Sequence, residues 1–87
     1  MMEYLARVVN YVMYKARVDR GGVVVIRTWE ICGVDRKCGW HVYVIMQMIQ
    51  RRGLAYRHKR GVYIMEKGNV PKVLSLLKEK LPRTIKR

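Results

Sequence analysis

Apolar residues recur at helical spacing in three stretches of the chain: residues 2–18, 36–52 and 70–81. In each stretch they collect on one face at intervals of three and four residues, as in an amphipathic helix packed on a core. On the first helix this face carries Leu5, Val8, Val9, Val12, Met13 and Ala16. Asp35 is suited to cap the second helix and Gly53 to end it, and Pro71 suits the first turn of the third. The pattern predicts three long helices.

Shorter stretches contain the β-branched and aromatic residues typical of strands. Residues 23–27 predict one strand, and residues 54–65 predict a hairpin whose two arms flank a basic, glycine-ended tip. Between them, residues 29–32 predict a short helix with Thr28 as its N-cap and Gly33 just after its last turn. The last long helix follows the hairpin, and Asn69 is a candidate for its cap.

The expected order is helix, strand, short helix, long helix, hairpin and helix, which is an α+β fold. A chain of 87 residues makes one domain. We assign residues 1–82 to this domain and residues 83–87 to a basic C-terminal tail.

Positive charge dominates the composition. Nineteen Lys and Arg residues against six Asp and Glu residues give a formal net charge of +13. This charge is self-repulsive unless a polyanion neutralises it, and phosphate backbones supply the matching charge, so nucleic acid is the favoured partner. One alternative is an anionic membrane surface, which is disfavoured because the basic residues are spread along the chain. The other is a solvated basic surface without a partner.

No apolar run approaches the roughly 18 residues needed to span a bilayer. Charged residues also interrupt the N-terminal stretch, which therefore does not resemble a signal peptide. These features predict a cytoplasmic protein, and its charge predicts association with the nucleoid.

Two local patterns accompany the order of elements. The first is Thr28-Trp29-Glu30-Ile31-Cys32-Gly33-Val34-Asp35, which leads into the long central helix, and the second is Arg52-Gly53-Leu54 before the hairpin. Together with that order they resemble the winged helix-turn-helix family, especially its small stand-alone transcription-regulator-like proteins from archaea. The resemblance implies that the chain binds double-stranded DNA as a transcriptional regulator or a chromatin-like architectural factor. The same fold also serves RNA-binding or ribosome-associated proteins and protein-binding modules of transcription or replication assemblies, which stay as alternatives.

On this scaffold the long central helix is the recognition helix, which lies in the major groove of DNA. At about 100° per residue, its face opposite the core carries Arg36, Lys37, Trp40, Tyr43, Val44, Gln47 and Arg51. Arginine bonds phosphate or guanine, glutamine pairs with adenine, and apolar side chains contact the thymine methyl group. Apolar residues on an outer face mark a contact surface, so the alternatives are a protein partner and additional core.

The hairpin corresponds to the wing of the family, with His58, Lys59 and Arg60 at its tip and Arg57 on the adjoining strand. In the family such tips follow a phosphate backbone or enter the adjacent minor groove, where the negative potential favours arginine. A basic hairpin tip on its own is as often a solvated turn. Beside a basic helix, the DNA-binding interpretation is favoured.

Cys32 and Cys38 bracket the turn between the short and the long helix, at core-facing positions. They predict either two buried thiols or a disulfide across the turn. Intracellular disulfides are common in hyperthermophiles, and few Asn and Gln residues with abundant Val, Ile, Lys and Arg also favour a thermophilic source.

Candidate catalytic and metal-binding groups are sparse. His41 extends the cysteines to a Cys-x5-Cys-x2-His string, but a fourth zinc ligand is lacking, so we predict no metal site and no cofactor. The acidic residues are scattered, and no nucleophile–base grouping or phosphate-binding loop is evident. The sequence predicts a binding module and not an enzyme.

Three tyrosines, Tyr4, Tyr11 and Tyr14, fall beside the apolar face of the first helix. A single small domain has little material to cover this flank, which predicts a homodimer. The alternative is that these tyrosines pack on the C-terminal segment of their own chain.

Overall fold

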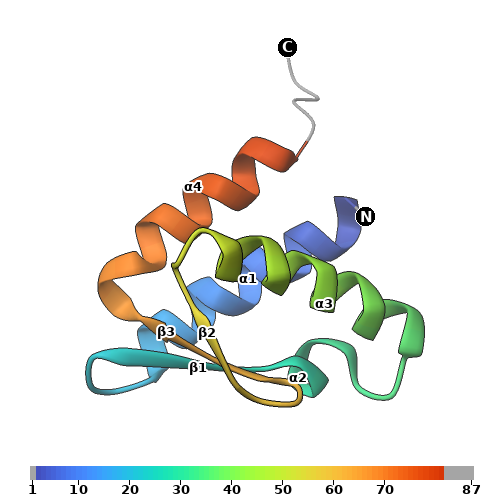
Figure 1. The fold of residues 1–87 in the computed structure, drawn as a ribbon, viewed down its shortest axis with the longest axis horizontal. Coiled ribbons are helices and arrows are strands. Elements are labelled where there is room, and N and C mark those ends of the chain that lie inside the picture. Colours follow the sequence, from blue (N-terminus) through green and yellow to red (C-terminus); the bar gives the residue numbers. More distant parts are fainter. Residues whose placement is uncertain (1, 82–87) are drawn as a thin grey trace.

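The computed structural model describes residues 2–81, which form four α-helices and a three-stranded antiparallel sheet in an α+β fold (Figure 1). In chain order the elements are α1 (Met2–Val18), β1 (Val23–Arg27), α2 (Thr28–Cys32), α3 (Arg36–Arg51), β2 (Tyr56–Lys59), β3 (Val62–Glu66), the 3-10 turn η1 (Lys67–Asn69) and α4 (Val70–Lys80). This is the order expected from the sequence. The basic tail expected at residues 83–87 lies outside the described residues.

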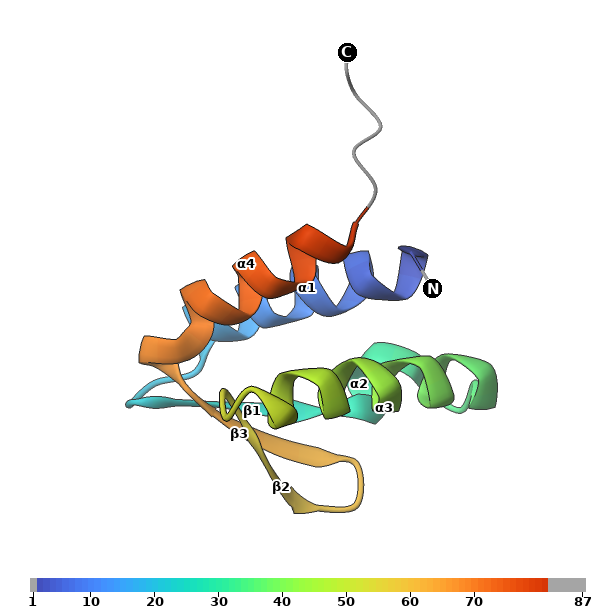
Figure 2. The ribbon, with the colours of Figure 1, turned by 45° about the horizontal axis from the view of Figure 1, so that its top comes forward.

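The sheet has the strand order β1-β3-β2, so the last strand of the chain is central. Along the first pair, Val23 lies opposite Glu66 and Arg27 lies opposite Val62. The second pair is irregular between Arg57 and Lys59, where His58 has no partner in the register. Figure 2 shows α1 and α4 side by side on one side of α3, and the β2–β3 hairpin projecting on the other side. The end of the hairpin that carries the turn therefore lies away from α1 and α4.

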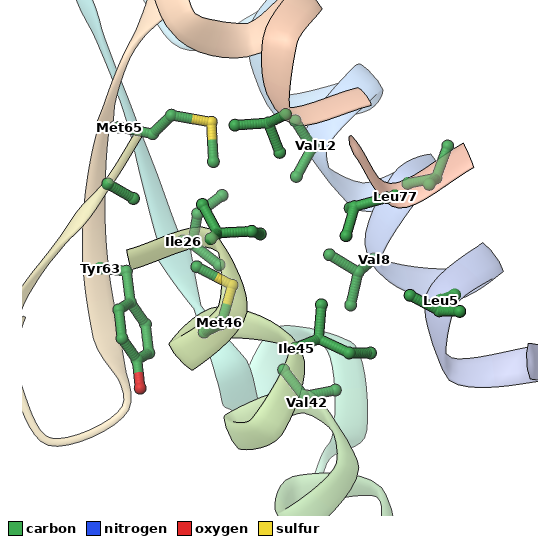
Figure 3. Packing of buried hydrophobic residues seen from close by; sticks show 14 of the residues in the cluster. Leu5, Val8, Val12, Ile26, Val42, Ile45, Met46, Tyr63, Met65 and Leu77 are labelled. Atoms are coloured by element: carbon green, nitrogen blue, oxygen red, sulfur yellow. The ribbon is translucent and has the colours of Figure 1, made fainter. Parts of the chain in front are cut away.

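The hydrophobic core is built from one face of each long helix and from the sheet. In Figure 3 Val8 of α1 points toward Ile45 of α3, with Ile26 of β1 and Leu77 of α4 beside them. All four side chains are at most 1% exposed. The predicted inner face of α3 is confirmed as buried: Cys38, Val42, Ile45, Met46 and Ile49. Burial of each such residue contributes about 1.5–3 kcal/mol to the stability of the fold. Because the chain is short and its core small, each of these contributions matters.

One prediction for α1 is wrong. Met13, expected in the core, is 41% exposed, whereas Lys15, on another side of α1, is buried. The Lys15 ammonium lies 3.0 Å from the Asp19 carboxylate, which also accepts a hydrogen bond of 3.1 Å from the backbone N–H of Val25. Burial disfavours ionisation of Asp19, but the Val25 N–H and the Lys15 charge outweigh it, so the pKa of Asp19 is lowered. This pairing is what allows a lysine at an inward-facing position.

Helix ends follow the sequence at some positions and depart from it at others. The Asp35 side chain accepts hydrogen bonds from the N–H groups of Lys37 and Cys38, so its role as the cap of α3 is confirmed. Thr28 is not a cap but the first residue of α2, and its N–H donates to the carbonyl of Gly61. Asn69 occupies the expected N-cap position of α4, but its side chain makes no capping hydrogen bond, and its amide approaches the Leu54 carbonyl at 3.5 Å. In both cases the group contacts residues of the segment 54–65.

Two of the three tyrosines pack within the chain. Tyr4 is 7% exposed and stacks on His41 of α3, with ring centroids 4.5 Å apart. The Tyr11 hydroxyl accepts from the Arg27 N–H at 3.2 Å and donates to the Glu30 carboxylate. Burial, and next the Glu30 carboxylate, raise the pKa of Tyr11, while the Arg27 N–H opposes the shift. Of the predicted dimer flank, Tyr14 alone is exposed, and the partners of the other two lie on α2, α3 and β1.

No helix within residues 2–81 is long and apolar enough to cross a membrane.

Candidate nucleic-acid interface

A disulfide joins α2 to the first turn of α3. Cys32 and Cys38 form this bond with their Cα atoms 5.5 Å apart. The Cys38 sulfur is buried, and the guanidinium of Arg7 lies 3.5 Å from it. Both sulfurs are thus covalently engaged, and within residues 2–81 no group of three or more His, Cys, Asp or Glu side chains is placed to hold a metal ion. The bond fixes where α3 begins relative to α2.

The outer face of α3 presents an aromatic pair. Trp40 is 61% exposed, and its ring stacks on that of Tyr43 with centroids 5.8 Å apart. Contact between the apolar ring of an exposed tryptophan and water is unfavourable, so covering the ring by a partner would lower the free energy. Around this pair lie exposed Arg36, Lys37 and Arg51 and the partly buried Val44 and Gln47.

Gln47 is held by its neighbour one turn away. Its side-chain amide donates a hydrogen bond of 2.7 Å to the Tyr43 hydroxyl. A glutamine amide has two N–H donors and a carbonyl acceptor, so one N–H and the oxygen stay free. Those are the two groups that a bidentate contact with adenine requires.

The hairpin is shorter at its tip than the sequence suggested. His58 and Lys59 belong to β2, and the turn consists of Arg60 and Gly61 alone. Every residue of β2 is exposed, including Arg57. The turn also leans on α2, where the Thr28 N–H donates to the Gly61 carbonyl at 2.9 Å. Basic side chains therefore stand along an anchored edge strand, not at a free tip.

Helix α3 and the hairpin together enclose a hollow of about 560 Å³. Its lining residues are Thr28, Gly39, Trp40, Tyr43, Arg57, Arg60, Gly61 and Tyr63. A second hollow of about 480 Å³ continues along α3 and is lined by Trp40, Tyr43, Val44, Gln47, Met48, Arg51 and Arg52. Trp40 and Tyr43 border both. In the described chain no acidic residue lines either hollow, so their charged groups are all arginines.

The structure thus brings together most of the expected residues from α3 and two from the hairpin. Arg36, Lys37, His58 and Lys59 are exposed but line neither hollow. Tyr63 was not among the expected residues and is paired with Arg57 across the hairpin. Burial raises the pKa of the Tyr63 phenol and the Arg57 charge opposes this. The pairing of β2 with β3 is the signal that could have identified Tyr63.

Arg52 and Met48 were also absent from the expected site. Met48 lies near the C-terminal end of α3, and Arg52 directly follows the helix; both border the second hollow. Met48 follows Gln47 and Arg52 follows Arg51 in the sequence, and this adjacency to expected residues is the signal that could have identified them.

No protein-family model matches the chain, and comparison with curated proteins and with solved structures finds no match.

Proposed function

We propose that this chain is a winged-helix protein that binds double-stranded DNA, with α3 in the major groove and the β2–β3 hairpin on the flanking backbone. One observation carries the proposal: the exposed aromatic pair of α3 and Arg57 and Arg60 of the hairpin line a single hollow without acidic residues. The order of elements and the β1-β3-β2 sheet support the fold assignment. The net charge of +13 supports a polyanionic partner.

The proposed contacts divide by element. The major groove is about 12 Å wide and admits one helix, whose outer side chains then face the base edges. On α3 these are Trp40 and Gln47, with Arg51 at the end of the helix in reach of guanine or phosphate. From the hairpin, Arg57 and Arg60 contact phosphates and so fix the position of the helix without reading sequence.

A regulator and an architectural factor use this interface differently. A regulator discriminates its site from random DNA by a factor of at least about 10³, whereas an architectural protein barely discriminates. Gln47 is the feature that favours sequence reading, because Tyr43 holds its amide in a defined position. The exposed basic strand β2 is compatible with both a regulator and an architectural factor. Either function places the protein on the nucleoid.

A second candidate is binding of RNA or single strands. The exposed Trp40–Tyr43 pair supports it, because unpaired bases stack on aromatic rings. The third, a protein partner at the tyrosine flank of α1, loses support because Tyr4 and Tyr11 pack internally.

The proposal is tested by anisotropy titrations with duplex DNA, single-stranded DNA and structured RNA of equal length at one salt concentration. We expect the duplex to bind at least tenfold tighter, equivalent to about 1.4 kcal/mol. A double variant, Arg57→Ala with Arg60→Ala, should weaken duplex binding. The matched control, Lys72→Ala with Lys78→Ala, removes the same charge from exposed positions of α4 and should weaken it much less. Tighter binding of single strands or RNA, or equal effects of the two double variants, would contradict the proposal.

A further inference from the structure

The outer face of α1 is an exposed surface to which the proposed DNA interface assigns no role. Leu5, Val8 and Val12 point into the core, and the opposite side of the helix is exposed. Two of its larger side chains, Met13 and Tyr14, are 41% and 55% exposed. Apolar side chains grouped on an outer helix face are typical of a contact surface.

Three polar residues on this face are arranged so that two antiparallel copies of α1 would be complementary. Glu3, Asn10 and Arg17 are seven residues apart, and seven residues turn an α-helix to within about 20° of the same direction. All three are exposed. An acid, an amide and a base therefore follow one line along α1, with the amide at its midpoint. An antiparallel copy centred on Asn10 sets the acid of each helix against the base of the other.

We propose that two copies of the chain pair through the outer faces of their α1 helices, antiparallel and with Asn10 on the twofold axis. Each Glu3 then meets Arg17 of the second copy, giving two ion pairs. The two Asn10 amides meet each other, and an amide can both donate and accept, so a like pair is self-complementary.

The residues beside this line fit the same arrangement. Ala6 and Met13 lie on the same side of the line through Glu3, Asn10 and Arg17. In an antiparallel pair related by a twofold axis, this side of one helix faces the same side of the other. Each Met13 thus packs against Ala6 of the second copy, a long side chain over a small one. This accounts for the exposure of Met13, which the core of a single chain leaves uncovered.

The dimer surface and the proposed DNA interface are separate. In Figure 3 Val8 of α1 and Ile45 of α3 point toward each other, so the outer faces of the two helices point away from each other. The dimer therefore does not depend on the proposed function, and it leaves both α3 faces free. Repulsion between the two basic chains opposes pairing, but at about 0.15 M salt it is screened beyond about 8 Å, whereas the local ion pairs persist.

The positions of Glu3 and Arg17 also suit the dipole of α1, which favours an acid in the first turn and a base in the last. The two explanations make opposite predictions for an exchange of the charges. Exchanging them opposes the helix dipole and lowers stability, but it restores complementarity between two copies that carry the same exchange.

The test is sedimentation equilibrium of the full chain without DNA. We expect a dimer for the natural sequence, and a dissociation constant raised by about tenfold or more in Glu3→Arg or Arg17→Glu, because both ion pairs become like-charge contacts. The doubly exchanged variant, Glu3→Arg with Arg17→Glu, should return to within about threefold of the natural value even though it melts at a lower temperature. Glu79→Arg and Lys78→Glu make the same charge changes on exposed positions of α4 and should leave the dimer unchanged.

Cross-linking gives an independent readout. Asn10→Cys should form a disulfide between two copies under mild oxidation, because a residue on a twofold axis faces itself, whereas exposed Ser75→Cys on α4 should not. A monomer at high micromolar concentration, an exchanged variant that stays monomeric, or equal cross-linking at the two positions would overturn the proposal.

Discussion

The backbone carbonyl of Gly61, in the hairpin turn, accepts a hydrogen bond of 2.9 Å from the N–H of Thr28, the first residue of α2. Gly61 has a φ of +77°, and a Cβ atom placed on it would lie 3.2 Å from the Thr28 hydroxyl oxygen. The hairpin is therefore joined to the helical unit at its far end as well as through the sheet. The bond holds the hairpin turn beside the start of α2, which the Cys32–Cys38 disulfide joins to α3.

Replacing this glycine should lower stability. Gly61→Ala adds a side chain at positive φ and against Thr28, so we expect a loss of about 1–2 kcal/mol in the free energy of unfolding, measured in urea. Gly68→Ala is the matched control, since a Cβ there would contact nothing within 4 Å and its φ is not positive. Equal losses in the two variants would show that the hairpin turn is not anchored.

Reducing the protein should also lower stability. Opening the Cys32–Cys38 bond frees the turn between α2 and α3, and for so short a loop we expect a loss of roughly 2 kcal/mol, measured by urea unfolding with and without reductant. A variant with alanine at both positions should be insensitive to reductant. Two free thiols by mass spectrometry after aerobic purification would contradict the disulfide.

Stability should fall at alkaline pH through Tyr11. Its pKa is raised in the folded protein, so the folded state holds the phenol proton where the unfolded chain, with a pKa of about 10, releases it. The contribution of Tyr11 is therefore complete below about pH 10 and is lost as the pH rises further. Tyr11→Phe should cost about 1 kcal/mol at neutral pH, because the Arg27 N–H and Glu30 lose their partner.

Lysines also titrate at alkaline pH, but they do so equally in the natural protein and in Tyr11→Phe, so a comparison of the two reports on the Tyr11 phenol alone. The difference in unfolding free energy between the natural protein and Tyr11→Phe should shrink above pH 10. A difference that stays constant with pH would mean that the Tyr11 hydroxyl is not held in the observed hydrogen bonds.

Helix α3 and the hairpin should fail differently when mutated. Gln47→Ala should cost about 1–3 kcal/mol on a preferred duplex found by selection, and much less on random duplex, because it removes a base contact. Lys59→Ala with Arg60→Ala should weaken binding to all duplexes alike and make the slope of log K against log salt shallower by about two. Equal weakening of every duplex by both variants would exclude base reading by α3.

Local patterns in the sequence were sufficient for the order of elements and for one face of α3. The spacing of Val42, Ile45 and Ile49 reports burial directly, because a helix returns to the same face every three or four residues. The Asp35 cap is equally local, since its side chain bonds N–H groups two and three residues ahead. Each of these features is contained within one element.

The features that the sequence did not reveal are contacts between elements. Threonine is a residue type typical of helix caps, but the N–H of Thr28 donates to the carbonyl of Gly61, 33 residues later in the chain. Lys15 is too polar for a buried position without a partner. That partner, Asp19, is held in place by the backbone N–H of Val25 in β1. The hollow between α3 and the hairpin depends on the register of β2 against β3, which places Tyr63 beside Arg57. Periodicity within one segment contains none of this information.

The decisive measurement for DNA binding through phosphate contacts is the salt dependence of duplex affinity. If the basic hairpin and α3 neutralise about five or more phosphates, the logarithm of the association constant should fall with the logarithm of salt concentration at a slope of about −4 or steeper. The measurement needs one duplex, the unmodified protein and salt concentrations from about 50 to 300 mM. We expect a slope of that size, whereas a flat response would exclude neutralisation of phosphates by the hairpin and α3.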